Sequence, residues 1–475
     1  MIRKIGFIFI LALAAAATGR AQDTMQVLPH VKPRLIVLTD LSNEPDDEES
    51  LVRLLVYSDQ FDIEGLVATT SNWLKQNPRE DLIRRDLAAY AEVRANLVRH
   101  SPGFPTMEQL SAVTRTGQTE YGLAATGPGK DSGGSRRIIE AVDRADGRPV
   151  WVSVWGGPNT LAQALWAVRE SRPPAEVDTF VAKLRVYAIS DQDDSGPWLR
   201  REFPRLFYIV SPSNPSSYEE YYRATWSGIS GGVEIQSAPG YCSAMVCNPW
   251  LEANVINNHG PLGALYPKRL YLMEGDTPSF LGLIDRGLGW ELSPAYGGWG
   301  GRYALFQAAG EARPIWTEIN ATRDRVEVEP GRFDSSNQAT IWRWRKHFQN
   351  DFAARMDWCV ADDFRKANHN PRPVLNGDRS TGVIAISAQA GATVNLSAAG
   401  TDAGDDGQNV KVTWWIYPEA GTLDGPALAP ANGLSTTVTL PPSQKPGAVH
   451  VILQAEDDGT PHLFAYRRII INVKP

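Results

Sequence analysis

Six carboxylates lie in the segment from Thr39 to Glu49, which reads Thr-Asp-Leu-Ser-Asn-Glu-Pro-Asp-Asp-Glu-Glu. They follow a short apolar run at residues 34–38 that is typical of a buried strand. So much negative charge is unfavourable unless a cation lies among the oxygens, and a hard ion such as Ca²⁺ prefers carboxylate ligands. The acids at 46–49 also fall where a following helix would begin, and the helix dipole favours negative charge there. The pattern therefore indicates either a metal site or an acidic helix start.

The first two thirds of the chain alternate strand-like and helix-like segments around this acidic loop. Strands are expected at residues 34–38, 61–69, 149–154, 183–189 and 206–210, and helices at residues 50–57, 79–99 and 160–170. This rhythm predicts an α/β domain with an open, mostly parallel sheet and flanking helices. Ligands of such sheets bind at the carboxyl ends of the strands, which is where the acidic loop lies.

After residue 379 the helical signals stop. Strand-like segments follow at residues 392–396, 410–417, 435–440, 449–455 and 468–473, separated by turn residues. Their spacing predicts an immunoglobulin-like β-sandwich. We therefore expect an α/β domain at residues 30–367 and a sandwich at residues 380–475, with a linker at residues 368–379.

Residues 1–21 have the form of a secretory signal peptide. Arg3 and Lys4 precede an apolar run at residues 5–17, and small residues follow it. This run is too short for a membrane span, and no later run is long enough. We expect a secreted protein, periplasmic or extracellular, with no membrane partner. Cys242 and Cys247 either close a small disulfide loop there or are buried thiols.

Composition excludes several function classes. The net charge of −7 and the lack of a basic stretch argue against a nucleic-acid partner. The seven His are too scattered for a zinc site, and no Gly-x-Ser-x-Gly turn supports a serine nucleophile. Fifteen Trp are many for this length, and each either packs in the core or offers a flat face to a sugar.

The acidic loop resembles the Asp-Thr-Asp-Pro-Gly-x-Asp-Asp signature of nucleoside hydrolases, which supplies calcium ligands and the catalytic base. Asp46 and Asp47 match its closing pair. Read without gaps, Asp40 matches the first Asp and Ser42 takes the place of the base. With two extra residues in the loop, Asp40 becomes both ligand and base. Both registers remain open.

Three further segments resemble this family in the same chain order. Residues 65–72 align with a strand that ends in a sugar-binding Asn, and residues 153–160 with a glycine-rich turn whose carbonyl reaches the metal. Residues 274–278 align with the step that carries the last metal-binding Asp. The resemblance thus implies a calcium cofactor.

Carried onto this chain, the resemblance names individual residues. It implies calcium ligands from Asp40, Asp47, Asp276 and the carbonyl of Trp155. It implies that Asn72 hydrogen-bonds the sugar.

The whole chain is more similar still to a secreted branch of cellulose-binding, nucleoside-hydrolase-like proteins with a C-terminal immunoglobulin-like domain. The shared features lie at residues 43–47, 190–196, 274–280 and 297–302. The resemblance implies a carbohydrate partner, a glycan or furanoside with cellulose included, and a possible homo-oligomer. Asn43, Asp194 and Trp299 in these segments are predicted to bind substrate, although Asp194 also fits a solvated acidic loop and Trp299 a packed glycine-rich turn.

Two functions follow. The first is a secreted, calcium-dependent glycoside hydrolase in which Asp40 is the base and Asp46 hydrogen-bonds the sugar hydroxyls. The family's His before the last ligand is Gly275 here, which puts nucleoside substrates in doubt and requires another proton donor. The candidates are Glu274, Glu44 and Glu202.

The second function is a non-catalytic carbohydrate-binding protein that keeps the fold and the metal site. Cellulose binding would then use exposed aromatic faces, for which Trp414 and Trp415 are candidates.

Overall fold

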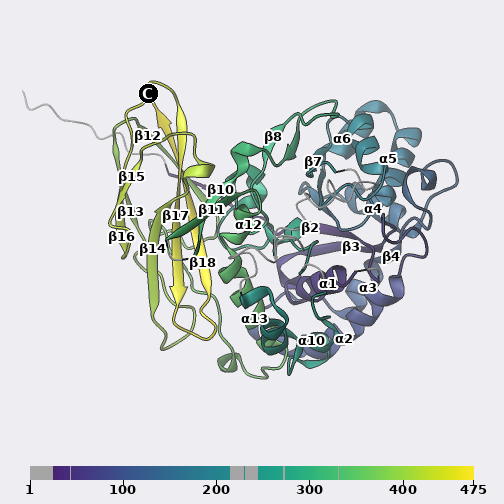
Figure 1. Cartoon of the computed structure of the whole chain (residues 1–475), viewed down its shortest axis with the longest axis horizontal. Helices are drawn as coiled ribbons and strands as arrows, with labels where there is room; N and C mark the ends of the chain where they lie inside the picture. Colours follow the sequence, from purple (N-terminus) through teal and green to yellow (C-terminus); the bar gives the residue numbers. More distant parts are fainter. Residues whose placement is uncertain (1–24, 43, 214–228, 230–243, 271–272, 330) are drawn as a thin grey trace, which may run out of the picture.

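The computed structural model of the protein describes residues 25–42, 44–213, 229, 244–270, 273–329 and 331–475 (Figure 1). The predicted signal peptide at residues 1–21, Asn43 and Cys242 lie outside the described residues, so these predictions stay predictions. No helix within the described ranges has the length and apolar character that a membrane crossing needs.

The N-terminal domain is built on an eight-stranded sheet with the order β4-β3-β2-β5-β6-β7-β9-β8. β8 pairs antiparallel with β9, and the other neighbours pair in parallel. The strands are β2 (Arg34–Thr39), β3 (Asp62–Ala68), β4 (Thr114–Thr116), β5 (Val150–Val154), β6 (Leu184–Ala188), β7 (Phe207–Ile209), β8 (Ala304–Phe306) and β9 (Ile315–Thr317). The five predicted strands are all present, and the predicted parallel α/β fold is confirmed.

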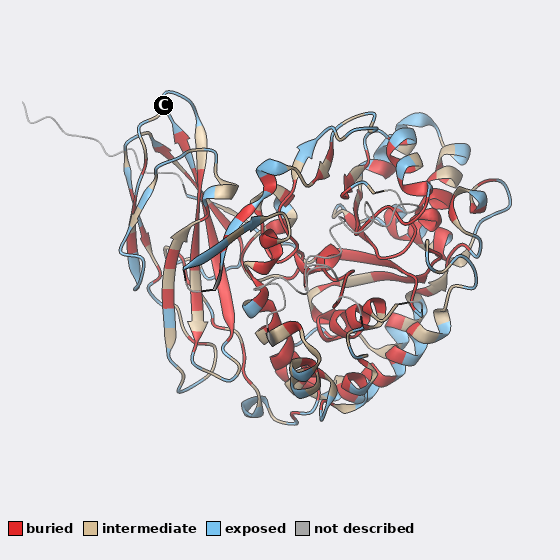
Figure 2. Cartoon of the chain, viewed as in Figure 1, coloured by how far each residue is buried: buried red, intermediate tan, exposed pale blue. Residues whose placement is uncertain are grey.

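Helices cover both faces of this sheet because its central strands are apolar on both sides. Leu35 and Val37 of β2 enter one core, and Ile36 and Leu38 enter the other. Figure 2 shows the strands buried between the two helical layers. The first layer contains α1 (Asp46–Val56), α2 (Glu80–His100), α3 (Met107–Val113) and α13 (Arg345–Trp358), and the second contains α4 (Gly133–Asp143), α5 (Asn159–Ser171), α6 (Pro174–Ala182) and α7 (Ser195–Glu202).

The C-terminal domain is a two-sheet sandwich, which confirms the predicted immunoglobulin-like architecture. One sheet has the order β1-β12-β18-β17-β14 and the other β13-β16-β15. The strands are β1 (Gln26–Leu28), β12 (Val383–Gln389), β13 (Thr393–Ser397), β14 (Val410–Ile416), β15 (Ala427–Ala429), β16 (Ser435–Thr439), β17 (Gly447–Asp457) and β18 (Phe464–Lys474). β1, which precedes the α/β domain in sequence, pairs with β12 of this sandwich.

The two domains share one aromatic cluster. The Trp344 ring lies 5.4 to 6.1 Å, centroid to centroid, from the rings of Trp415, Tyr417 and Tyr466. Trp414 is 1% exposed in the sandwich core. Trp414 therefore offers no open face to cellulose, whereas Trp415 is half-buried and its role in binding stays a prediction.

Residues 368–379 are not the free linker that their composition predicts. Asn368 is buried, and its side chain donates to Asp457 Oδ1 at 3.1 Å and to the Pro461 carbonyl at 2.8 Å. The connection is thus fixed to the sandwich, and Figure 1 shows the sandwich, in yellow and green, beside α13.

Arg468 of β18 should be essential for this docking. It is fully buried, and its guanidinium donates to the carbonyls of Leu288 at 2.6 Å and Gly297 at 2.7 Å. Arg468→Met leaves these buried acceptors unpaired, which we expect to lower the free energy of unfolding by about 3 kcal/mol. Asn472→Ala, at an exposed position of the same strand, should change it by less than about 0.5 kcal/mol. Urea unfolding followed by tryptophan fluorescence measures both, and equal effects would contradict the assignment.

Candidate metal and sugar site

Three aspartates from two distant segments meet at the carboxyl edge of the main sheet. Asp46 and Asp47 begin α1, and Asp276 lies just before α11 (Pro278–Leu281). Each offers one carboxylate oxygen, and these oxygens lie within 4.8 Å of one another. All three residues are buried. The structure therefore brings the predicted site residue Asp276 next to Asp46 and Asp47, which lie far from it in the sequence.

Hydrogen bonds fix the segment around residue 276 against α1. The Glu274 N–H donates to Glu49 Oε2 at 2.7 Å, and the Thr277 hydroxyl donates to Ser50 Oγ at 3.0 Å. The Thr39 hydroxyl at the end of β2 donates to Asp47 Oδ1. α1 begins at Asp46, so the predicted acidic helix start and the carboxylate cluster are the same structure.

Several carboxylate oxygens in this region are buried without a partner. Among the described residues, Asp40 Oδ1, Asp46 Oδ1 and Asp276 Oδ2 accept no hydrogen bond. A buried, unpaired carboxylate oxygen is costly, and a cation among several of them removes that cost. The donor set, oxygen atoms from at least three carboxylates, fits a hard divalent ion such as Ca²⁺.

Burial and mutual repulsion raise the pKa values of this cluster. Burial, then repulsion from the neighbouring carboxylates, raises the pKa of Asp46, Asp47 and Asp276 well above the usual range. Burial raises the pKa of Asp40 to about 6. Burial, and to a smaller extent the nearby charge of Asp40, raise the pKa of Glu44 to about 7. Without a cation, the ionised forms of these carboxyl groups are therefore unfavourable.

Asp40 lies beside the cluster, against the glycine-rich turn after β5. A Cβ on Gly156 would lie 2.5 Å from Asp40 Oδ1, and a Cβ on Gly157 would lie 2.3 Å from Asp193 Oδ2. Glycine at both positions thus lets two carboxylates approach consecutive backbone units. Asp40 is also hydrogen-bonded by the Ser71 hydroxyl.

The burial of Asp40 is compatible with the loop register in which Asp40 is both metal ligand and base, and that register stays a prediction. Asp40 is 4% exposed, whereas Ser42 is exposed and has a φ of 104°. A serine in that conformation marks a tight loop between the strand and α1. Ser42 is therefore poorly placed to be the base.

The carbonyl of Trp155, a predicted metal ligand, accepts a hydrogen bond from Gln192 Nε2 at 2.6 Å. A carbonyl oxygen has a second lone pair, so this contact leaves the prediction open. Asn72 is half-buried in the loop after β3. Its contact with sugar also remains a prediction.

Glu274 does not have the environment of a proton donor. Its carboxylate accepts two hydrogen bonds from Arg53, one from the Tyr266 hydroxyl at 2.9 Å and one from the Thr277 hydroxyl at 2.8 Å. Glu274 and Arg53 are both fully buried. Both oxygens of this carboxylate are occupied by these donors, so Glu274 positions the turn that carries Asp276.

Two predicted sugar contacts do not fit their surroundings. Trp299 is 2% exposed and packs edge-on against Phe348 in the core, so it is the packed turn of the alternative interpretation. Asp194 is exposed and accepts from the Leu123 N–H at 2.8 Å. Its neighbour Asp193 is buried, and among the described residues the Asp193 Oδ2 atom has no hydrogen-bond partner.

Sequence reasoning did not single out Asp193 within its acidic loop, and it missed Gln192 and Ser71. The acidic stretch at residues 191–194 follows β6 and was visible in the sequence, but three aspartates in four positions do not reveal which one points inward. Burial raises the pKa of Asp193 to about 7. Asp191 is instead paired with Arg200 at 2.7 Å.

Two family profiles match the chain. A family profile described as "Cellulose-binding Sde182, nucleoside hydrolase-like domain" matches residues 34–303, and one described as "Cellulose-binding protein Sde0182, C-terminal domain" matches residues 393–473. No curated protein matches the chain.

Among solved structures, a nucleoside hydrolase-related hypothetical protein from Saccharophagus degradans, described as associated with carbohydrate metabolism, is 37% identical. The alignment covers 94% of this chain and 100% of that chain, with a TM-score of 0.80. The effector protein XOO4466 is 13% identical over 70% of this chain and 95% of that chain, with a TM-score of 0.30, which supports no argument.

Removal of the charge of one cluster carboxylate should weaken cation binding. We expect titration calorimetry of chelator-treated protein to show one Ca²⁺ site, and Asp276→Asn to weaken it at least tenfold because the central donor set loses a charge. Asp424→Asn, in an exposed turn of the sandwich, is the matched control and should bind as the unmodified protein does. Binding retained by Asp276→Asn would contradict the site.

Stability without calcium should fall as the pH rises. The folded-state pKa values of Asp40 and Glu44, about 6 and about 7, lie above the unfolded values near 4. The folded state thus binds more protons, and the stability present below about pH 4 is lost as the pH rises through 6 to 7. We expect the Tm in chelator to decrease from pH 5 to pH 8 and the gain from added Ca²⁺ to increase. Differential scanning fluorimetry measures the Tm. A Tm that rises from pH 5 to pH 8 both in chelator and with added Ca²⁺ would refute this prediction.

Proposed function

Since the chain belongs to the family of cellulose-binding, nucleoside hydrolase-like proteins, we propose that it hydrolyses glycosidic bonds of a glycan with the help of calcium. The observation that carries this proposal is the buried carboxylate cluster of Asp46, Asp47 and Asp276, with Asp40 at its side. A protein that only held the flat surface of cellulose would have no need for such a costly group of buried charges.

Calcium fits the cluster, because the carboxylate oxygens of Asp46, Asp47 and Asp276 that lie within 4.8 Å of one another are the hard donors it prefers. Asp40, Asp47 and Asp276 would hold it, with the Trp155 carbonyl as a further ligand. When bound, the ion supplies positive charge that neutralises the carboxylates and favours vicinal sugar hydroxyls as additional ligands.

Asp40 acts as the general base in this proposal. Its pKa of about 6 leaves it mostly ionised at neutral pH, and its free Oδ1 can accept a proton from the attacking water. Gly156 and the Ser71 hydroxyl hold the carboxylate in place. Asp46, with an unpartnered Oδ1, accepts hydrogen bonds from the sugar hydroxyls and fixes the ring for attack.

Glu44 is the proton donor that the sequence left undecided. It is half-buried in the loop between β2 and α1, and its carboxyl is close enough to feel the charge of Asp40. A carboxyl with a pKa of about 7 is protonated in about half of the molecules at neutral pH, and the protonated form can give its proton to a leaving sugar oxygen. Glu202 is excluded from this role, because it lies at the far end of α7 in exposed ion pairs.

Trp73 provides a surface for the next sugar unit. Its side chain is 42% exposed, and its backbone N–H donates at 3.0 Å to Ser71 Oγ, the group that also contacts Asp40. The indole is thus attached to the same short turn as the base. Flat indole faces stack on the C–H face of sugars, so this position favours a substrate with more than one sugar unit.

A non-catalytic binding protein is the second candidate. Gly275 in place of the family's His and the commitment of Glu274 to Arg53 both favour it. Binding at the acidic site would then use the same cation and sugar contacts without turnover. We also infer export from the cytoplasm on the basis of residues 1–21.

Glu44→Gln should separate the two steps of the proposed mechanism. Against oligosaccharides we expect kcat to fall by about 10²- to 10⁴-fold, because a sugar alkoxide leaves only when protonated. Against p-nitrophenyl glycosides, whose leaving group needs no proton, the fall should be less than about tenfold. Asp40→Asn should reduce both reactions, and Asp424→Asn neither.

Reducing-sugar release and nitrophenolate absorbance, with and without Ca²⁺, measure these activities on a panel of furanosides, cello-oligosaccharides and ribonucleosides. If the protein retains glycan in a calcium-dependent way but turns over none of these substrates, the hydrolase proposal is wrong and the protein is a binding protein.

A further inference from the structure

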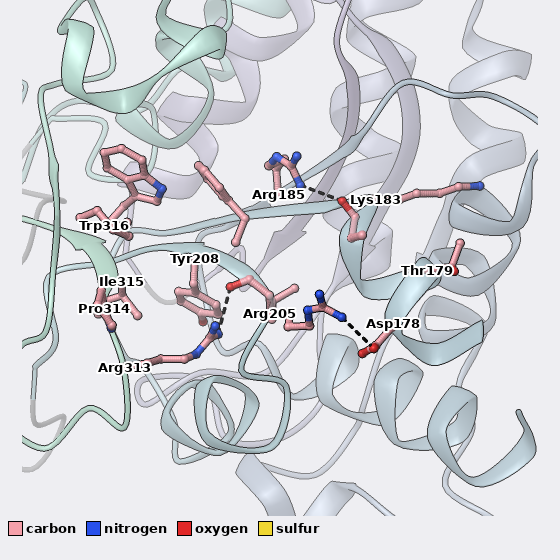
Figure 3. Close-up of a pocket in the computed structure, with 14 residues that line it drawn as sticks. Asp178, Thr179, Lys183, Arg185, Arg205, Tyr208, Arg313, Pro314, Ile315 and Trp316 are labelled. Carbon is pink, nitrogen blue, oxygen red and sulfur yellow. Dashed lines mark hydrogen bonds and ion pairs between the residues drawn. The ribbon is translucent and has the colours of Figure 1, made fainter. Parts of the chain in front are cut away.

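A second pocket lies at the opposite end of the main sheet from the acidic cluster. It has a volume of about 910 Å³ and opens at the amino ends of β6, β7 and β9, beside the end of α6 (Figure 3). The five residues of β6 span about 16 Å. This pocket is therefore separate from the carboxylate site at the other edge, and its size lies within the range of small-ligand sites.

The lining of this pocket is basic, although the whole chain has a net charge of −7. Its charged residues are Lys183, Arg185, Arg205, Arg313 and one acid, Asp178. Asp178 pairs with Arg205 at 2.9 Å, and both side chains are more than half exposed, so this pair is weak. Lys183 Nζ turns away to the Val142 carbonyl at 3.0 Å.

Two guanidinium groups remain without an acidic partner. Arg185 donates to the carbonyls of Ala182 and Leu184, both at 2.9 Å, and Arg313 donates to the Phe203 carbonyl at 2.9 Å. Among the described residues, no carboxylate oxygen lies within 4.0 Å of the nitrogens of either arginine. Burial lowers the pKa of Arg185, and no neighbouring acid counteracts it. An anion would relieve this unfavourable state.

The other wall of the pocket is flat and apolar. Leu305 and Trp316 are paired across β8 and β9, so their side chains share one face of the sheet edge. The Trp316 ring lies 6.0 Å from the Phe207 ring, and the Arg185 guanidinium lies 5.1 Å from that same ring. Figure 3 shows Trp316 on one side of the pocket, with Arg185 and Arg313 on two other sides.

We propose that this pocket binds an acidic sugar, a uronate residue of a glycan, with its carboxylate between Arg185 and Arg313 and its C–H face on Trp316. A guanidinium recognises a planar carboxylate through paired N–H donors, and an indole recognises a sugar ring through its face. The pocket supplies both groups within one cavity, whereas the acidic cluster at the other edge repels such a ligand.

The test uses Asp276→Asn protein in calcium-free buffer, so that neither cation binding nor hydrolysis at the acidic site contributes. Titration calorimetry with tetragalacturonate at low ionic strength should show binding that weakens as salt is added, because the contacts are ionic. Cellotetraose, the neutral counterpart, should bind at least tenfold more weakly. Inorganic phosphate should compete only at concentrations far above those of tetragalacturonate.

Arg185→Gln in the same background should weaken tetragalacturonate binding at least tenfold, and Arg313→Gln gives an independent variant if Arg185→Gln fails to fold. Arg365→Gln is the matched control, since this arginine is 86% exposed, pairs with Asp363 and does not line the pocket, so binding should be unchanged. Equal binding of cellotetraose, phosphate binding as tight as that of tetragalacturonate, or no effect of either pocket variant would overturn the uronate site. Each outcome is independent of whether the protein hydrolyses glycans.

Discussion

Repulsion among buried carboxylates at the junction of β2 and α1 is the constraint that organises this protein. Asp46, Asp47 and Asp276 hold oxygens within 4.8 Å of one another, although all three are buried. Part of the cost is offset locally, because Asp46 and Asp47 lie at the N-terminus of α1, where the helix dipole favours negative charge. The remaining cost is what makes the site a strong candidate to hold a cation.

The surrounding structure can be understood as support for that cluster. The buried Arg53–Glu274 pair fixes the turn before Asp276, and Glu274 has a φ of 50°, which is rare for a residue with a side chain. Glycines at 156 and 157 let Asp40 and Asp193 approach the backbone from the neighbouring strand ends. Removing one partner of a buried ion pair leaves an uncompensated charge, so these residues are coupled to the site without touching substrate.

The sandwich is attached to this domain as part of one packed structure. Trp344 contacts Trp415, Tyr417 and Tyr466, and Arg468 donates across the boundary to two carbonyls of the α/β domain. The aromatic residues Trp415, Tyr417 and Tyr466 of the sandwich therefore stabilise the contact between the domains.

The sequence by itself determined the order of the elements and the place of the acidic loop. Apolar runs such as residues 34–38 predict buried strands whatever their partners are, and the acids at residues 46–49 predict a helix start, because both signals are local. The resemblance of the segments around Asp46, Asp47 and Asp276 to a known family named these residues. Tertiary structure decided which neighbours serve the site. In the folded protein, Glu274 is the ion-pair partner of Arg53, and Trp299 is a core residue. Asp193 is buried with an unpartnered oxygen, whereas Asp194 is exposed. These outcomes depend on contacts between segments far apart in the chain, and burial, which sets the pKa and the available partners of a side chain, exists only after those segments have packed together.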